Sequence, residues 1–99
     1  SSAVVPVEEA PVERKTDFVE AEVDLVESPL VGVAYLAAGP DKPNFVSIGD
    51  TVKKGQTLVI IEAMKVMNEI PAPKDGVVTE ILVENEEMVE FGKGLVRIK

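Results

Sequence analysis

Short apolar stretches alternate with turn-forming residues along most of the chain, from Val23 to Lys99. The main stretches are "VDLVESPLVGVAYLA", "NFVSIG", "QTLVIIEA", "GVVTEILVE" and "LVRIK". Between them stand Ser-Pro, Gly-Pro, Gly-Asp and Lys-Gly pairs, which favour tight turns. Many short strands at close spacing with glycine-rich turns predict an all-β sandwich or barrel. The segment "TEILVENEEMVEF" alone suggests a helix, and it fits two strands around an Asn-Glu turn equally well.

The chain also contains an internal duplication. Residues 46–61 ("VSIGDTVKKGQTLVII") align without gaps to residues 83–98 ("VENEEMVEFGKGLVRI"), with six of the 16 positions identical. Upstream, the pattern Pro-x-x-Gly-Val of residues 29–33 recurs at residues 73–77. Halves of this size cannot bury their apolar faces alone and must pack on each other. We therefore predict a pseudo-two-fold axis with about four strands in each half.

The two matching blocks lie further apart in the first half than in the second. The upstream blocks are offset by 44 residues and the downstream blocks by 37, so the first half has seven additional residues. These fall within "LAAGPDKPNF", which is rich in glycine and proline. We predict an insertion at this point on an otherwise economical barrel.

The stretch "IIEAMKVMNEI" joins two good strand sequences at Met64 and Lys65. Two-residue hairpin turns favour Asn, Asp or Gly because they hold residues at positive φ, which suits methionine and lysine poorly. A local rule broken between two good strands is where function is expected. The joint is also the midpoint of the duplication, so we expect it to protrude at one end of the barrel, with the termini at the other.

Composition excludes several classes of function. Ten basic and 18 acidic residues give a net charge of −8, which argues against binding to nucleic acid or an anionic membrane surface. The chain has neither cysteine nor histidine, so it lacks a thiolate nucleophile, a Ser-His triad and the usual soft metal ligands. No signal peptide or membrane span is evident, and a cytoplasmic location is expected.

Residues 1–22 differ in character from the rest of the chain. They contain prolines, alanines, scattered valines and glutamates without a sustained period of 2 or 3.6. The first 24 residues hold seven acids and two bases, so most of the negative charge lies there. We interpret residues 1–22 as a flexible acidic linker and residues 23–99 as the folded domain.

The segment "EAMKVMNEI", with "SPLVG" before it and "GKGLVRI" after it, resembles the attachment site of biotin carboxyl carrier proteins. The resemblance covers roughly residues 23–99. It implies a biotinyl/lipoyl-type flattened barrel of two four-stranded antiparallel sheets with biotin attached covalently to Lys65. Position 66 is valine where many family members have methionine or leucine. By the same resemblance, a biotin protein ligase would recognise the residues around the lysine, namely Glu62, Ala63, Met64, Val66 and Met67.

The insertion narrows the resemblance to carriers of bacterial-type acetyl-CoA carboxylase, in which a "thumb" lies near the attached biotin. The resemblance implies a non-catalytic carrier that moves carboxybiotin between a biotin carboxylase subunit and a carboxyltransferase subunit to form malonyl-CoA for fatty acid synthesis. It also implies that this segment is monomeric. The thumb would consist of Ala37, Ala38, Gly39, Pro40, Asp41, Lys42, Pro43 and Asn44, stiffened by its two prolines.

Four alternatives stay open at this point. A biotinyl domain of another carboxylase or decarboxylase would share the motif, and a lipoyl carrier domain would share the barrel and the hairpin lysine. Lipoyl domains, however, usually carry an acidic residue directly before the lysine, where this chain has Met64. An unmodified interaction module would need an exposed apolar patch away from Lys65. The fourth is an enzyme or metal site built from Glu62, Asn68 and Glu69, whose spacing supplies few clustered acids.

Overall fold

The computed structural model describes residues 24–99, and this part of the chain contains eight β-strands and no helix. The predicted linker, residues 1–22, and Val23 lie outside the described residues. The strands are β1 (Asp24–Glu27), β2 (Gly32–Tyr35), β3 (Thr51–Val52), β4 (Thr57–Ala63), β5 (Val66–Pro71), β6 (Gly76–Ile81), β7 (Glu87–Val89) and β8 (Gly94–Ile98).

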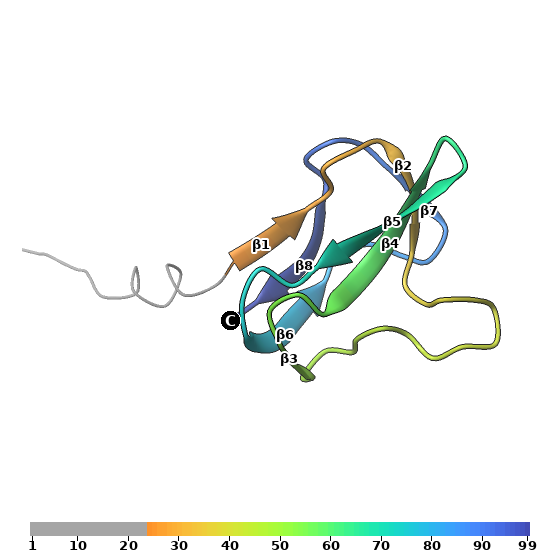
Figure 1. The fold of residues 1–99 in the computed structure, drawn as a ribbon. Helices are drawn as coiled ribbons and strands as arrows, with labels where there is room; N and C mark the ends of the chain where they lie inside the picture. Colours follow the sequence, from red (N-terminus) through yellow and green to blue (C-terminus); the bar gives the residue numbers. More distant parts are fainter. Residues whose placement is uncertain (1–23) are drawn as a thin grey trace, which may run out of the picture.

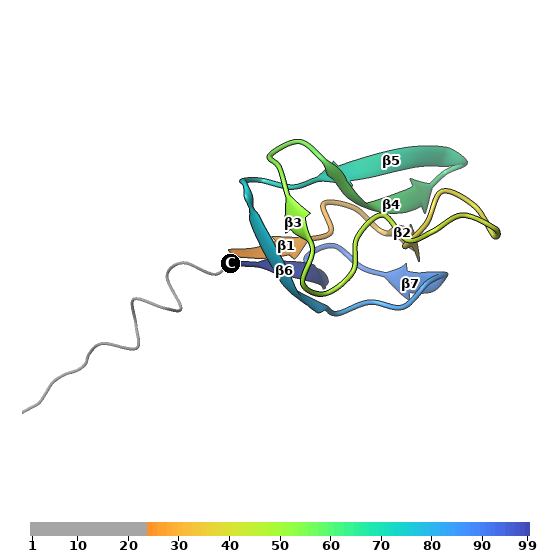
Figure 2. The same ribbon diagram turned by 90° about the horizontal axis from the view of Figure 1, so that it is seen from below.

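Two four-stranded sheets pack face to face, with the orders β1-β8-β6-β3 and β5-β4-β2-β7 (Figures 1 and 2). Every neighbouring pair is antiparallel. Each sheet contains strands from both halves of the duplication, so neither half can form a complete sheet alone. The predicted all-β flattened barrel with two antiparallel sheets is confirmed.

The two sheets are equivalent strand by strand. Replacing β1, β8, β6 and β3 by β5, β4, β2 and β7 converts the order of one sheet into that of the other. The register agrees as well, because Asp24 lies opposite Ile98 as Asn68 lies opposite Ile61. The predicted duplication is therefore a structural repeat, with β1–β4 as its first half and β5–β8 as its second.

The core lies between the sheets and consists mainly of valine, leucine and isoleucine. The residues that are identical in both halves have structural roles in the turns and in the core. One identical pair, Gly55 and Gly92, occupies turns at φ of +92° and +88°, a conformation that favours glycine. The other five are buried apolar pairs: Val46/Val83, Val52/Val89, Leu58/Leu95, Val59/Val96 and Ile61/Ile98.

A second pair of glycines allows the backbones of neighbouring strands to approach closely. A Cβ atom on Gly32 would collide with the carbonyl oxygen of Glu62, and one on Gly76 would collide with that of Lys99. These glycines begin β2 and β6, which are equivalent strands of the repeat. The recurring Pro-x-x-Gly-Val pattern thus reflects a steric requirement that both halves share.

The stretch "NFVSIG", residues 44–49, differs from a regular strand. Only Asn44 takes part in a bridge, to Ala37, and the next strand is β3 at Thr51–Val52. Val46 is nevertheless buried, as is its equivalent Val83 in the second half. The apolar pattern here belongs to a connecting segment, in which Val46 packs into the core without forming strand hydrogen bonds.

The β4–β5 turn lies at the opposite end of the barrel from the start of β1 and the C-terminus (Figure 1). β1 and β8 correspond to β5 and β4 under the repeat, so the same type of strand pair occurs at both ends. At one end Met64 and Lys65 join β4 to β5, and at the other lie the start of β1 and the C-terminal residue after β8. The expectation that the joint protrudes is confirmed.

Candidate functional site

The β4–β5 hairpin closes with the two-residue turn Met64–Lys65. Ala63 lies opposite Val66 on the two strands, and the turn residues have φ of +53° and +65°. Consecutive left-handed residues are the geometry of a type I′ hairpin turn, whose twist matches the flanking strands. Each non-glycine residue in this region costs about 1–3 kcal/mol, which the surrounding hairpin must offset. The turn thus holds Lys65 at the extreme end of the barrel at a conformational cost.

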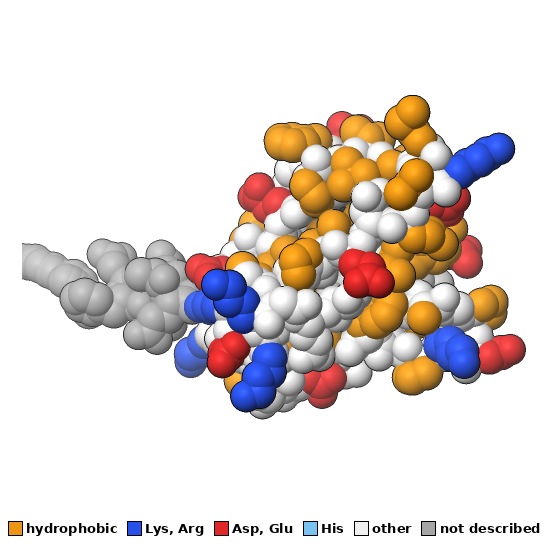
Figure 3. All heavy atoms as spheres, viewed as in Figure 1, with side chains coloured by type: hydrophobic (Ala, Val, Ile, Leu, Met, Phe, Trp, Pro, Cys, Tyr) orange, Lys and Arg blue, Asp and Glu red, His pale blue; other side chains and the backbone are white. Residues whose placement is uncertain are grey.

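Apolar side chains surround the lysine. Met64 is 95% exposed, and Val66 and Met67 are exposed to 57% and 58%. On the face drawn in Figure 3, hydrophobic side chains gather over the upper part of the barrel, which includes the hairpin, and charged side chains lie at both ends of this face. A thioether that contributes nothing to the core suits contact with another molecule, because methionine adapts its shape to the surface it meets.

Two side chains that the sequence analysis did not assign to the site support the hairpin. The amide of Asn68 donates to the carbonyl oxygens of Ile61 (3.3 Å) and Val66 (3.2 Å). The hydroxyl of Tyr35 on β2 donates to Oε1 of Glu62 at 3.2 Å. This hydrogen bond raises the pKa of Tyr35 above its ordinary value of 10, with burial and the charges of Glu62 and Glu86 adding to the effect. Both contacts stabilise the strands that present Lys65.

The segment between β2 and β3 forms a closed loop at the predicted thumb. Ala37 and Asn44 form an antiparallel bridge at its base, and Lys42 N–H donates to the carbonyl oxygen of Gly39 at 3.1 Å near its tip. The bridge coincides with the predicted limits of residues 37–44. In two views the loop extends toward the same end of the barrel as the hairpin turn (Figures 1 and 2).

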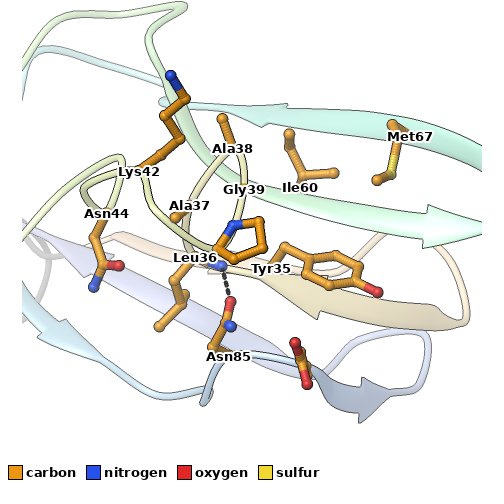
Figure 4. Close-up of a pocket in the computed structure, with 12 residues that line it drawn as sticks. Tyr35, Leu36, Ala37, Ala38, Gly39, Lys42, Asn44, Ile60, Met67 and Asn85 are labelled. Carbon is orange, nitrogen blue, oxygen red and sulfur yellow. Dashed lines mark hydrogen bonds between the residues drawn. The ribbon is translucent and has the colours of Figure 1, made fainter.

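A pocket of about 370 Å³ lies between this loop and the hairpin (Figure 4). Ile60 and Met67 reach it from β4 and β5, and Tyr35 reaches it from β2. Its wall is completed by Leu36, by the loop residues Ala37, Ala38, Gly39, Pro40, Lys42 and Asn44, and by Asn85 and Glu86 before β7. The pocket is therefore partly apolar, with amide, hydroxyl and charged groups at its edges, as expected for a site that orients a small ligand.

The predicted site residues divide into two groups. Met64, Lys65, Val66 and Met67 are exposed on the hairpin, whereas Glu62 and Ala63 are half-buried. Of the thumb residues, all line the pocket except Asp41 and Pro43. Met67, which is two residues along the chain from Lys65, and the thumb line the same pocket. No motif in the sequence pointed to Tyr35 or Asn85, because their contacts join strands that are far apart in the chain. Asn68 entered the sequence analysis only as a member of the candidate metal set.

The described residues offer few side chains for metal binding or catalysis. Within residues 24–99, no group of three or more Asp, Glu, His or Cys side chains is placed to hold a metal ion. Of the candidate set Glu62, Asn68 and Glu69, Glu62 accepts from the hydroxyl of Tyr35 and Glu69 accepts from Thr57 Oγ1 at 3.1 Å. No helix long and apolar enough to cross a membrane occurs in the described part of the chain. The amine of Lys65 is an exposed potential nucleophile at the tip of the hairpin.

Comparison with known sequences gives consistent names. Residues 24–98 match a protein family described as "Biotin-requiring enzyme". A relative from Streptococcus pyogenes is 77% identical over 95 residues and one from Nostoc is 49% identical over 82 residues. Both are named biotin carboxyl carrier protein of acetyl-CoA carboxylase. The alignments cover 96% and 83% of this chain but 55% and 45% of the relatives, so the chain spans about half their length.

Solved structures of similar shape are parts of much larger proteins. The urea carboxylase of Kluyveromyces lactis contains a similar domain, with a TM-score of 0.67 and 30% identity over 97% of this chain and 8% of that protein. A single-chain, multi-domain long-chain acyl-CoA carboxylase has a TM-score of 0.66 over 89% of this chain and 8% of its own. Its identity of 23% supports the likeness of fold alone.

Proposed function

The chain belongs to the family of biotin-requiring enzyme domains, and from this premise we propose that it is the carrier domain of an acetyl-CoA carboxylase, with biotin attached to Lys65. The observation that carries the proposal is the placement of Lys65. It stands on a left-handed turn at the extreme end of the barrel, within the sequence that resembles the biotin attachment site. The names of the relatives support the choice of biotin and of this carboxylase.

Attachment of biotin is an acyl transfer onto the Nζ amine of Lys65. The amine attacks the carbonyl carbon of biotinyl-adenylate, an amide bond forms, the bond to the adenylate oxygen breaks, and the amine loses a proton. Only the uncharged amine is nucleophilic. Since no described side chain is paired with Lys65 as a base, we assign deprotonation to the biotin protein ligase. The rigid turn lets the ligase enclose the lysine with little backbone rearrangement.

The long side chain of Lys65 and the chain of the attached cofactor together form a flexible arm. Biotin supplies a ureido nitrogen that can carry a carboxyl group from one active site to another. Tethering raises its effective concentration at a biotin carboxylase subunit and a carboxyltransferase subunit, provided that the linker spans both. We include in the proposal that the domain is itself non-catalytic, works in the cytoplasm and is monomeric in this segment.

We further propose that residues 37–44 act as the thumb and cover the attached cofactor. The pocket beneath the loop is lined by Met67, two residues from Lys65, so the arm of Lys65 can fold back into it. Ile60 and Met67 offer an apolar wall for a ring, and Asn44 offers a polar group at the edge. Covering the ring between transfers would keep it from water.

The test of this function is the intact mass of the chain after incubation with biotin, ATP and a biotin protein ligase. We expect one biotinyl adduct on the parent chain and on the Lys54→Arg control, and none on Lys65→Arg. The fold of Lys65→Arg should be intact because the side chain is exposed and remains charged. An adduct on Lys65→Arg would place the site elsewhere.

A parallel incubation with lipoate and a lipoate ligase separates the nearest alternative. The family description and the names of the relatives favour biotin. A lipoyl adduct on the parent chain, with no biotinyl adduct, would assign the domain to lipoate instead. If neither ligase modified the parent chain, the carrier function would be wrong.

A further inference from the structure

The thumb is attached to the barrel through Leu36, the residue directly before it. The N–H of Leu36 donates to Oδ1 of Asn85 at 2.8 Å (Figure 4). The carbonyl oxygen of Leu36 accepts from the N–H of Phe45 at 2.8 Å. Leu36 and Asn85 are 49 residues apart and come from different halves. One side-chain hydrogen bond from the second half therefore holds the base of a loop that belongs to the first.

The turn that carries Asn85 is itself pinned to the barrel. Glu86 N–H donates to the carbonyl oxygen of Ala34 on β2 at 2.6 Å, two residues before Leu36. Within the turn, Glu87 N–H donates to the carbonyl oxygen of Glu84 at 3.1 Å, and Glu84 N–H donates to Oε1 of Glu87 at 2.9 Å. These bonds fix the turn independently of Asn85, so its side chain is free to serve another purpose.

The equivalent turn in the first half, residues 47–50, has the same bonds. Gly49 N–H donates to the carbonyl oxygen of Val78 at 2.7 Å, and Asp50 N–H donates to that of Ser47 at 3.0 Å. Ser47 N–H donates in turn to Oδ2 of Asp50 at 2.9 Å. The position equivalent to Asn85 is Ile48, which is 65% exposed and has no polar group to offer.

This comparison isolates the hydrogen bond between Asn85 and Leu36. The barrel needs the turn in both halves, but it does not need an acceptor side chain there, as Ile48 shows. An acceptor is present only in the turn that faces the thumb, and the thumb is present only in one half. The acceptor side chain thus contacts the residue from which the thumb begins, Leu36.

We propose that Asn85 is a positioning residue that holds the thumb over the pocket beside Lys65. Its carboxamide oxygen fixes Leu36, and the carbonyl oxygen of Leu36 in turn fixes Phe45. The residues at the two ends of the loop are therefore held in place. Asn85 also lies at the wall of the pocket that the thumb borders. The part of this inference that concerns the cofactor rests on the proposed function.

Amide hydrogen exchange of the 99-residue chain tests the positioning role without any cofactor. Asn85→Ile copies the residue of the equivalent turn and removes the acceptor, whereas Asn85→Asp keeps an acceptor oxygen. We expect exchange at Leu36, Lys42 and Phe45 to accelerate about fivefold to tenfold in Asn85→Ile, as for the loss of one net hydrogen bond. Asn85→Asp and the matched control Ile48→Ala should leave these three amides close to the parent.

The pattern of exchange decides between positioning and a purely local bond. Acceleration at Leu36 alone would overturn the proposal, because the rest of the thumb would then be held by other contacts. Equal acceleration at Gly49 and Gly55, in the turns remote from the thumb, would also overturn it by showing general destabilisation. These results do not depend on biotin, so a failure here is distinct from a failure of the proposed function.

The cofactor-dependent part has a separate readout in the ligase-treated chain. We expect biotin attachment to shift the amide resonances of residues 37–44 in the parent and in Asn85→Asp. In Asn85→Ile the shifts should be largely lost, while the extent of biotin attachment stays the same. Undiminished shifts in Asn85→Ile would show that the thumb meets the cofactor without help from Asn85 and would overturn this part.

Discussion

The two halves of the barrel have the same arrangement of strands, but the thumb and the lysine-bearing turn belong to the first half alone. In both halves the second strand begins with a glycine, a turn with the same hydrogen bonds follows, and the last strand is largely buried. The first half adds the thumb, residues 37–44, and ends at the turn that presents Lys65. The second half has neither addition, and its last strand leads to the C-terminus.

The difference separates what makes the barrel from what makes the site. Residues that recur in both halves, such as Leu58 and Leu95, are buried and serve the core. Lys65 and Asn85, which have no equivalent of the same type, lie at the hairpin turn and at the pocket. A duplicated fold thus provides its own internal control, since one half shows the requirements of the frame without those of the site.

The largest effect is expected from truncating the equivalent core leucines. Leu58→Ala and Leu95→Ala each remove a fully buried side chain, so each should lower the free energy of unfolding by about 2–5 kcal/mol. Urea denaturation measures both losses. If the halves are energetically equivalent, the two values should agree closely. A loss confined to one variant would show that one half carries most of the stability.

The next largest effect concerns the paired glycines. Gly32→Ala and Gly76→Ala each place a Cβ against a backbone carbonyl of the neighbouring strand, and we expect each to destabilise by about 1–3 kcal/mol. Thermal unfolding should show the loss in both variants. Gly39→Ala in the thumb is the control, because its nearest neighbour would be Lys42 Cγ at an ordinary 3.6 Å. A mild effect at Gly32 or Gly76 would mean that the strands can separate freely.

A smaller effect of opposite sign is expected at the turn before β7. Glu86 has φ of +68°, where its equivalent in the first half is Gly49 at +97°. Glu86→Gly relieves the left-handed conformation and should stabilise the fold by roughly 0.5–1 kcal/mol after the entropy of glycine in the unfolded chain is considered. Denaturation against the exposed control Glu90→Gly, whose φ is not positive, measures the gain. Destabilisation by Glu86→Gly would indicate that the carboxylate makes a favourable contact.

The smallest predicted effect is in titration. Tyr35 is the only tyrosine and the chain has no tryptophan, so tyrosinate absorbance reports this residue alone. Its pKa should lie above 10 in the folded chain and fall toward 10 in Glu62→Gln, with Glu69→Gln as a control that changes nothing. Because the folded pKa is raised, the stabilising hydrogen bond is present below pH 10 and is lost as the pH rises through the folded pKa. An unchanged pKa in Glu62→Gln would contradict the assignment of its cause.

Much of the fold followed from spacing alone. Val46, Leu58 and Ile61 recur at a constant offset, and every such apolar pair proved to be buried. Met64 and Lys65 stood between two strand patterns, and a hairpin there required positive φ at both. Local patterns determine these features because alternation of side chains and turn chemistry depend on a few neighbouring residues.

Other features depended on how distant strands meet. The contact of Tyr35 with Glu62 spans 27 residues and that of Leu36 with Asn85 spans 49. Each hydrogen bond forms only when the register of the sheets and the course of the inserted loop have brought the two residues together. The apolar run of residues 44–49 gave no sign that it would bury Val46 without forming a strand.

By itself, then, the sequence determined a duplicated β-barrel, an insertion of seven residues within residues 36–45, and a lysine displayed on a strained turn. These properties are encoded in residue type and spacing, which act locally. The tertiary structure alone decided that the thumb closes a pocket beside the hairpin and that Asn85 from the other half holds its base. Such contacts form between side chains that are remote in the chain, and their geometry exists only once both sheets have assembled.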